Sequence, residues 1–362
     1  MIEQVVIRVD SGLQIGTGHV MRCLTLADSL RTQGAKVQFI CRKHKGDLIE
    51  LIESRSYHVF VLDSSQTSTC RDSGEKLHHS HWLEGSQQQD VRACNSILHD
   101  IQPDWLIVDH YALDYRWESA AKTNCKKLMV IDDLADREHI CDLLLDQTYS
   151  RRRNDYSRLV SESSIMLLGA EYALLRPEFA QWREFSLKRR VMPQLKNLLV
   201  NLGGADPNNI TGDVLEIIGK CGLSSEQKVV VVMGPTSPHL AAVRQLAQTL
   251  PFRTEVLFNV SNMAELMANS DLAIGAAGAT TWERCCLGLP SILLVLADNQ
   301  KNIAKVLQAK QIIETVAVDS LSVLCAKIDK ISSALTGYSE NAAKVTDGMG
   351  IKRVVDMMES HG

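Results

Sequence analysis

Long apolar runs and basic clusters are both missing from this sequence of 362 residues. No run approaches the length of a membrane-spanning helix, and strand-like residues begin directly after Met1, without a charged and apolar leader. The net charge is −4, and no basic run is interleaved with aromatic residues, which argues against a nucleic-acid surface. We therefore expect a cytoplasmic, monomeric protein that binds a small molecule, with no nucleic acid and no membrane as partner.

The sequence also lacks the spacing typical of metal sites. Its ten cysteines include no Cys-x-x-Cys pair, and several fall in helical patterns, so we expect reduced thiols in the core. Cys70, His78, His79 and His81 form a cluster in the long polar segment 64–89, but no second Cys/His cluster completes a site. We interpret this segment as a solvated loop, which is either part of an active site or an insertion. We expect neither a metal nor a cofactor.

A glycine-rich loop with a histidine is the most informative feature that is present. It follows an apolar β-branched run at 5–9, spans 10–18, and leads into a helical pattern that stops at Gly34. His19 stands at the start of that helix, where the dipole disfavours its protonation, so it is a candidate general base. The loop matches neither a dinucleotide fingerprint nor a P-loop, since Met21 replaces the third glycine and His19 the lysine. The alternative is a tight turn with a surface histidine.

Strands and helices alternate through both halves of the chain, which predicts two parallel α/β sheets. Expected strands are 4–10, 37–42, 58–62, 104–109, 127–131 and 143–145, then 197–202, 228–233, 254–258, 271–275, 291–296 and 312–317. Helices are expected between them, including 137–141, 279–287 and a last stretch at 340–359. We place the domain boundary at Pro177, giving domains 1–177 and 178–362, with the last helix able to pack back on the first domain.

Three segments of the second half suit a phosphate and a sugar. A glycine turn follows a strand at 201–206, and a second glycine precedes two threonines and Glu283 at 276–283. Glu283 suits a ribose diol, although a helix-start charge that complements the dipole explains it as well. The third segment, 296–300, follows a strand at the edge where α/β sheets bind ligands; it binds the sugar or caps the next helix.

These motifs together resemble one enzyme family. They are Gly16-Thr17-Gly18-His19-Val20-Met21-Arg22, Val108-Asp109-His110-Tyr111, Leu168-Gly169, Asn201-Leu202-Gly203-Gly204-Ala205-Asp206, Gly278-Ala279-Thr280-Thr281-Trp282-Glu283 and Asp298-Asn299-Gln300. In order and over nearly the whole chain, they resemble the UDP-2,4-diacetamido-2,4,6-trideoxy-β-L-altropyranose hydrolases of pseudaminic-acid biosynthesis. That family is similar to the lipid II glucosaminyltransferase, so the resemblance implies the GT-B fold, with two Rossmann-like domains whose parallel sheets face a central cleft.

The resemblance also implies roles for individual residues. His19 corresponds to the catalytic histidine, Tyr111 and Asn299 to catalytic residues on the sugar side, and Glu283 to the ribose ligand. Substrate-binding candidates are Gly16, Gly18, Arg22, Asp109, Gly203, Gly204, Gly278, Ala279, Thr280, Glu283, Asp298 and Gln300. Arg22 either stabilises the departing pyrophosphate or forms an ion pair with an acid such as Asp10. Asp109, Asp132 and Asp133 stand at strand ends, where they line the cleft or cap helices.

The chemistry of a UDP-sugar hydrolase fits these residues. UDP is a good leaving group, so one base acting on water is sufficient, and His19 can supply it. No two aspartates are separated by a single residue, so the Asp-x-Asp motif of metal-dependent glycosyltransferases is absent, and we expect a metal-independent enzyme. Two alternatives stay open: a GT-B glycosyltransferase that uses the same donor, and a non-catalytic protein that binds nucleotide sugars.

Overall fold

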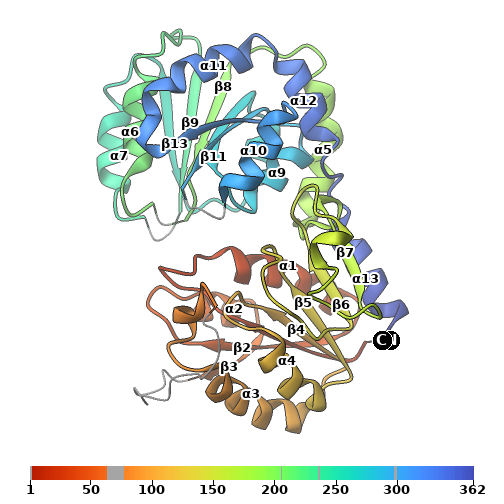
Figure 1. The fold of residues 1–362 in the computed structure, drawn as a ribbon. Helices are drawn as coiled ribbons and strands as arrows, with labels where there is room; N and C mark the ends of the chain where they lie inside the picture. The colour runs from red at the N-terminus through yellow and green to blue at the C-terminus, as the bar shows by residue number, and fades with distance from the viewer. Residues whose placement is uncertain (1, 63–76, 205, 235–236, 297–299) are drawn as a thin grey trace. The chain divides into compact units, whose positions relative to one another are not determined.

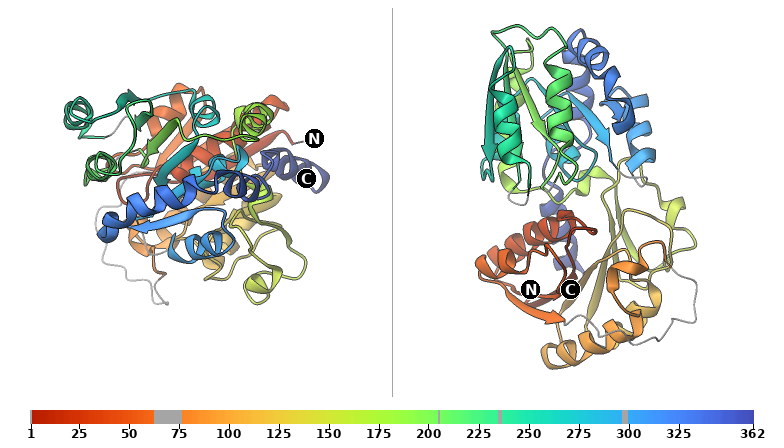
Figure 2. Two further views of the ribbon diagram at one scale, coloured as in Figure 1. Left: turned by 90° about the horizontal axis from the view of Figure 1, so that it is seen from above. Right: turned by 90° about the vertical axis from the view of Figure 1, so that its left-hand side faces the viewer.

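The computed structural model describes residues 2–62, 77–204, 206–234, 237–296 and 300–362. The chain forms two compact units, one of residues 1–174 with 350–362 and the other of residues 175–349. The expected first domain, ending at 177, thus runs three residues beyond the observed end at 174, and the end of the chain belongs to the first unit rather than the second. Helix α13 (Gly350–Ser360), dark blue in Figures 1 and 2, packs against α1 (Gly18–Thr32).

The first unit contains a seven-stranded sheet in the order β3-β2-β1-β4-β5-β6-β7, and every pairing is parallel. Its strands are β1 (Gln4–Val9), β2 (Lys36–Arg42), β3 (His58–Leu62), β4 (Trp105–Asp109), β5 (Lys127–Ile131), β6 (Leu143–Asp146) and β7 (Ile165–Leu168). All six predicted strands of this half are found. Strand β7 was not predicted, although Ser163 and Ser164 precede its four apolar residues and Gly169 follows them.

Helices cover both faces of this sheet (Figure 1). Because strand side chains alternate, Val5, Ile7 and Val9 pack into the core with α1, α2 (Ile49–Ser54) and α13, whereas Val6 packs into the core with α3 (Gln87–Ile101) and α4 (Tyr115–Ala121). The chain builds outward from β1 to β3 and then returns to β4 on the other side of β1. The carboxyl ends of β1 and β4 therefore form a switch point, where open α/β sheets bind ligands.

The second unit repeats this architecture with a six-stranded, all-parallel sheet in the order β10-β9-β8-β11-β12-β13. Its strands are β8 (Asn197–Asn201), β9 (Lys228–Met233), β10 (Arg253–Phe258), β11 (Leu272–Ala276), β12 (Ser291–Val295) and β13 (Glu314–Ala317). Its helices are α5 (Pro177–Arg189), α6 (Ile210–Ile218), α7 (Leu240–Ala247), α8 (Met263–Ala268), α9 (Thr280–Cys286), α10 (Lys301–Ala309), α11 (Leu324–Ser332) and α12 (Leu335–Ala343). The switch point here lies between β8 and β11.

Helix α5 was not predicted, and its contacts explain why. Its arginines bind the carbonyl ends of other helices, so the sequence shows little apolar periodicity. Arg183 donates to the carbonyl oxygens of Ala343 (2.7 Å) and Thr346 (3.1 Å), and Arg190, the residue directly after α5, to those of Ser270 (2.7 Å) and Met267 (3.1 Å). Positive charge at helix C-termini complements their dipoles.

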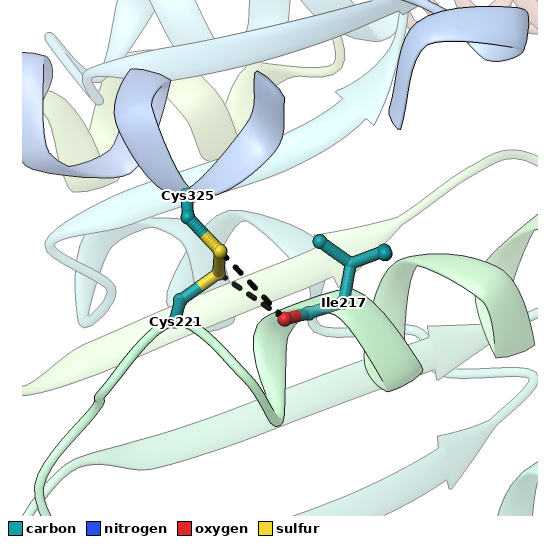
Figure 3. Close-up of a disulfide and its surroundings, with 3 residues drawn as sticks. All are labelled: Ile217, Cys221 and Cys325. Carbon is teal, nitrogen blue, oxygen red and sulfur yellow. Dashed lines mark hydrogen bonds between the residues drawn. A yellow bond between two sulfur atoms is a disulfide. The ribbon is translucent and has the colours of Figure 1, made fainter. Parts of the chain in front are cut away.

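Three further predictions are wrong. The last helical stretch, expected at 340–359, is divided between α12 and α13, and residues 344–349 between them are not helical. Residues 137–141 are not helical, because the N–H of His139 donates to Leu159 O (2.7 Å) and that of Ile140 to the Glu118 carboxylate (2.6 Å). The cysteines are not all reduced: Cys221, after α6, and Cys325, on α11, form a disulfide with their Cα atoms 5.0 Å apart (Figure 3). Their separation of 104 residues conceals the pairing in the sequence. No helix of the described residues has the length and hydrophobicity that a bilayer span requires.

The buried His139 makes the stability of the first unit pH-dependent. Burial alone lowers the pKa of His139, but the carboxylates of Glu118 (2.6 Å) and Asp132 (3.8 Å) raise it from 6.5 to about 9. The folded imidazolium therefore contributes stability that is complete below about pH 6.5 and is lost as the pH rises through about 9. At 1.4 kcal/mol per pKa unit the loss is roughly 3 kcal/mol. Denaturant unfolding at several pH values should show this slope in the wild type and not in His139→Gln.

Candidate functional site

The loop after β1 presents His19 at the switch point of the first sheet. Gly12 and Gly16 exchange backbone hydrogen bonds (N–H to O, 3.4 and 2.8 Å), and Gly16 has φ +84°, a conformation that favours glycine. Helix α1 then begins at Gly18, so His19 stands in its first turn and is 9% exposed. The backbone thereby aims this side chain at the end of β4, which pairs with β1.

Asp109, the last residue of β4, orients His19. Its carboxylate lies 2.6 Å from His19 Nδ1 and accepts two hydrogen bonds from Arg22, from Nε (2.7 Å) and Nη2 (2.7 Å). Burial alone would raise the pKa of Asp109, but Arg22 and His19 hold it well below its usual range. Because this carboxylate stays ionised, it accepts the Nδ1 proton of His19 and leaves Nε2 as the basic nitrogen. Nε2 has no hydrogen-bond partner in the described part of the chain and is not among its enclosed polar atoms.

Arg22 is held by carboxylates on two sides. Besides Asp109 it donates from Nη1 to Asp133 Oδ2 at 2.6 Å. The ion-pair interpretation of Arg22 therefore fits, but the predicted partner is wrong: Asp10 pairs with Arg8 and accepts from the N–H of Arg42 (2.7 Å).

Aromatic rings surround His19 on one side. The ring of Tyr111 lies edge-on to His19, with centroids 4.6 Å apart, and its hydroxyl donates to Asp133 Oδ2 at 2.5 Å. Burial and then the charge of Asp133 raise the pKa of Tyr111 well above 10, so it remains a neutral phenol. Trp82 stacks on Tyr111 (5.6 Å, 25°) and meets His19 edge-on at 6.0 Å.

Trp82 and His79 come from the described part of the polar segment 64–89, on and before a short 3-10 helix (Ser80–Leu83). His79 packs against the Trp82 ring at 4.4 Å. The sequence favoured a solvated loop, either part of an active site or an insertion, over a metal site for this histidine cluster, and it did not single out Trp82. The described residues contain no group of three His, Cys, Asp or Glu side chains placed to hold a metal ion. Cys70 lies outside the described residues.

A second buried network holds Asp10, the first residue of the loop. Arg8, the last residue but one of β1, donates to both Asp10 and Asp90 (Nη2 to Asp90, 2.8 Å), and Asp90 also accepts from Trp117 (2.9 Å). An arginine inside an apolar strand was the sequence signal for this network. Asp132, predicted to line the site or cap a helix, is instead enclosed: it accepts from Arg137 and Tyr156 and from the N–H groups of Leu134 and Ala135.

The predicted nucleotide residues of the second unit lie at its own switch point. Gly203, with φ +101°, and Gly204 follow β8, and Gly234 approaches so closely that a Cβ there would lie 2.2 Å from Gly204 O. The Asp206 carboxylate accepts from the N–H groups of Ile210 (2.8 Å) and Thr211 (2.9 Å) and thus caps the first turn of α6.

Glu283 lies in the first turn of α9, after Gly278, Ala279 and Thr280. Its nearest cation is Arg176, with Oε1 3.9 Å from Nη2, and its carboxylate accepts no hydrogen bond within the described residues. Burial raises its pKa, and Arg176 opposes this in part. Gln300 Oε1 accepts from the N–H of Leu296 at 2.9 Å, just after β12, and its side chain makes no cap bond to α10, so the capping alternative is wrong for this residue. Asp298 and Asn299 lie outside the described residues.

Comparisons with known proteins agree with these motifs. Residues 198–358 match the glycosyltransferase family 28 C-terminal domain. The UDP-2,4-diacetamido-2,4,6-trideoxy-beta-L-altropyranose hydrolase of Campylobacter jejuni is 25% identical over 85% of this chain and 97% of that protein. An uncharacterized protein of Methanocaldococcus jannaschii, MJ1062, is 26% identical over 82% of this chain. The matched region spans only 57% of the length of that relative.

Among solved structures, MurG of Acinetobacter baumannii superposes with a TM-score of 0.71, at 15% identity, over 99% of both chains. At that identity the likeness concerns the fold alone. The resemblance to the UDP-sugar hydrolases that the motifs predicted is confirmed, and the chain has the GT-B fold, with two Rossmann-like domains of parallel strands.

Proposed function

We propose that the protein hydrolyses UDP-2,4-diacetamido-2,4,6-trideoxy-β-L-altropyranose to UDP and 2,4-diacetamido-2,4,6-trideoxy-L-altrose. In this mechanism His19 Nε2 removes a proton from water, which attacks the anomeric carbon with inversion as UDP departs. The observation that carries the proposal is the 2.6 Å contact between His19 Nδ1 and the ionised Asp109, which leaves Nε2 free to act as a base. The name of the Campylobacter relative supports the choice of substrate.

The neighbours of His19 suit this reaction. Asp109 stabilises the imidazolium that forms when Nε2 takes the proton, as the carboxylate of a catalytic triad does. Tyr111 and Trp82 supply apolar ring surface of the kind that packs against sugars, and Tyr111 is fixed through its bond to Asp133. A cytoplasmic location and a monomeric state remain predictions from the sequence.

The match to a glycosyltransferase domain favours a second candidate, a transferase with the same donor. Incubation with candidate UDP-sugars and no acceptor, followed by an assay of free UDP, separates the two. We expect multiple turnovers per enzyme molecule. UDP release that requires an added acceptor would indicate the transferase, and binding without any release would indicate a non-catalytic protein.

Glu283→Ala is expected to weaken UDP binding and to leave folding intact. We assign its carboxylate, which accepts no hydrogen bond within the described residues, to the ribose diol, where hydrogen bonds to a charged acceptor contribute about 1.5–3 kcal/mol each. The Kd for UDP should rise roughly ten- to hundred-fold, as measured by calorimetry. Glu178→Ala is the matched control, because Glu178 also contacts Arg176 (2.8 Å). Equal affinities in the wild type and the Glu283 variant would return Glu283 to a helix-start role.

Activity is expected to survive EDTA. The sequence has no Asp-x-Asp motif, and Asp109 and Asp133, the carboxylates near His19, are both engaged by Arg22. Turnover should therefore be equal before and after chelation and dialysis. A loss of turnover that Mg²⁺ or Zn²⁺ restores would overturn the metal-independent mechanism.

A further inference from the structure

Arg284 lies beneath the turn that joins β11 to α9. It is 1% exposed, and its Nη2 donates to Ala276 O (2.8 Å) and to Thr281 Oγ1 (3.2 Å), which stand at the two ends of this turn. Its guanidinium rests on the backbone of Gly275, where an added Cβ would lie 2.2 Å from Nη1. A glycine is therefore needed at position 275 to admit the arginine.

The positive charge of Arg284 is not matched by a carboxylate. The buried Arg8 and Arg22 each form ion pairs; burial lowers their pKa values, but their acidic partners outweigh it and raise both pKa values well above the ordinary arginine value. Arg284 forms no ion pair within the described residues, and burial lowers its pKa to about 10, with only partial opposition from neighbours such as Glu283. Its Nε is enclosed and has no acceptor there. An unpaired buried charge is costly unless a ligand of opposite sign compensates it.

The turn above Arg284 offers hydrogen-bond donors for such a ligand. The N–H groups of Ala277, Thr281 and Trp282 donate to backbone carbonyls. Those of Gly278, Ala279 and Thr280 find no acceptor in the residues that the structure describes. Successive free N–H groups over a buried cation form a concave site suited to an anion with several oxygens.

We propose that Arg284 is a positioning residue for the diphosphate of the nucleotide: it holds the 276–281 turn in shape and supplies the positive charge beneath it. This inference rests on the proposed function, because it takes the ligand to be a nucleoside diphosphate. Because Arg284 is buried, its charge is screened less than a charge in water, so Arg284 also stabilises the charge that develops on the departing UDP.

The test compares UDP with uridine, which lacks the phosphates, by calorimetry. Arg284→Gln should weaken UDP binding at least tenfold and change uridine binding less than twofold, whereas Arg284→Lys should recover most of the UDP affinity. Gly275→Ala, which displaces the guanidinium without removing it, should give the same selective loss and serves if the glutamine variant does not fold.

Arg190→Gln is the matched control in the same unit. Arg190 is also buried and also donates to backbone carbonyls, at the far end of α9 (Leu287 O, 3.1 Å) and after α8. This variant should lower the melting temperature without changing the ratio of UDP to uridine affinity. An equal loss of both affinities in the Arg284 and Gly275 variants, or unchanged UDP binding, would overturn the inference.

The result also separates this inference from the proposed function. A wild-type protein that binds UDP selectively but releases none from UDP-sugars would contradict hydrolysis and leave the role of Arg284 intact. A wild-type protein that hydrolyses UDP-sugars, with an Arg284→Gln variant of unchanged UDP affinity, would support hydrolysis and contradict the role of Arg284.

Discussion

His19→Ala is expected to abolish turnover while UDP binding survives. Removing a positioned general base costs a factor of about 10²–10⁴ in rate. The nucleotide contacts that we assign lie in the second unit, so the Kd for UDP should not change. The measurement pairs kcat from UDP release with calorimetry on the same preparation.

His99→Ala provides the control, because His99 is an exposed histidine on α3 and should keep full activity. If the His19 variant retains even a tenth of the wild-type kcat, His19 is not the base. A parallel loss of UDP affinity would instead indicate a binding role for this residue.

Asp109→Asn should produce the second-largest effect. The amide cannot stabilise the imidazolium. Its NH₂ group can also donate to Nδ1, which puts the His19 proton on Nε2, the nitrogen that has to act as the base. It also leaves Arg22 with one carboxylate, Asp133, in place of two. We expect kcat to fall by about 10²–10³ with little change in KM.

Asp104→Asn is the matched control for this variant. Asp104 precedes β4 as Asp109 ends it, and it accepts from the N–H groups of Glu3 (2.8 Å) and Gln4 (2.9 Å), far along the strand from His19. The Asp104→Asn variant should keep the wild-type kcat. Melting temperatures of both variants must exceed the assay temperature, and full activity of a folded Asp109→Asn would exclude the dyad.

Local patterns were sufficient to predict much of the fold. Every expected strand is present, because buried parallel strands appear as short apolar runs between turn residues. The glycine loop predicted the position of His19 at the start of α1, since Gly16 takes the positive φ that such a turn needs. The motifs also identified the relative that carries the hydrolase name.

Other features depend on contacts between distant residues, which no local pattern records. Asp109 was named as a residue at a strand end, but its contact with His19 joins positions 90 apart. Trp82 reaches the same cluster from a segment that its composition describes only as polar. Arg284 directly follows the motif that ends at Glu283. It was not predicted as a site residue, because the sequence does not show that its charge is buried without an acidic partner.

The most direct test of the central claim, attack of water on the anomeric carbon, is hydrolysis in ¹⁸O-labelled water. Both products are analysed by mass spectrometry, early enough that anomeric exchange of the free sugar with solvent is small. We predict label in the sugar and unlabelled UDP. Label in the β-phosphate of UDP, or formation of UMP with a sugar 1-phosphate, would contradict the mechanism even if His19 proved essential.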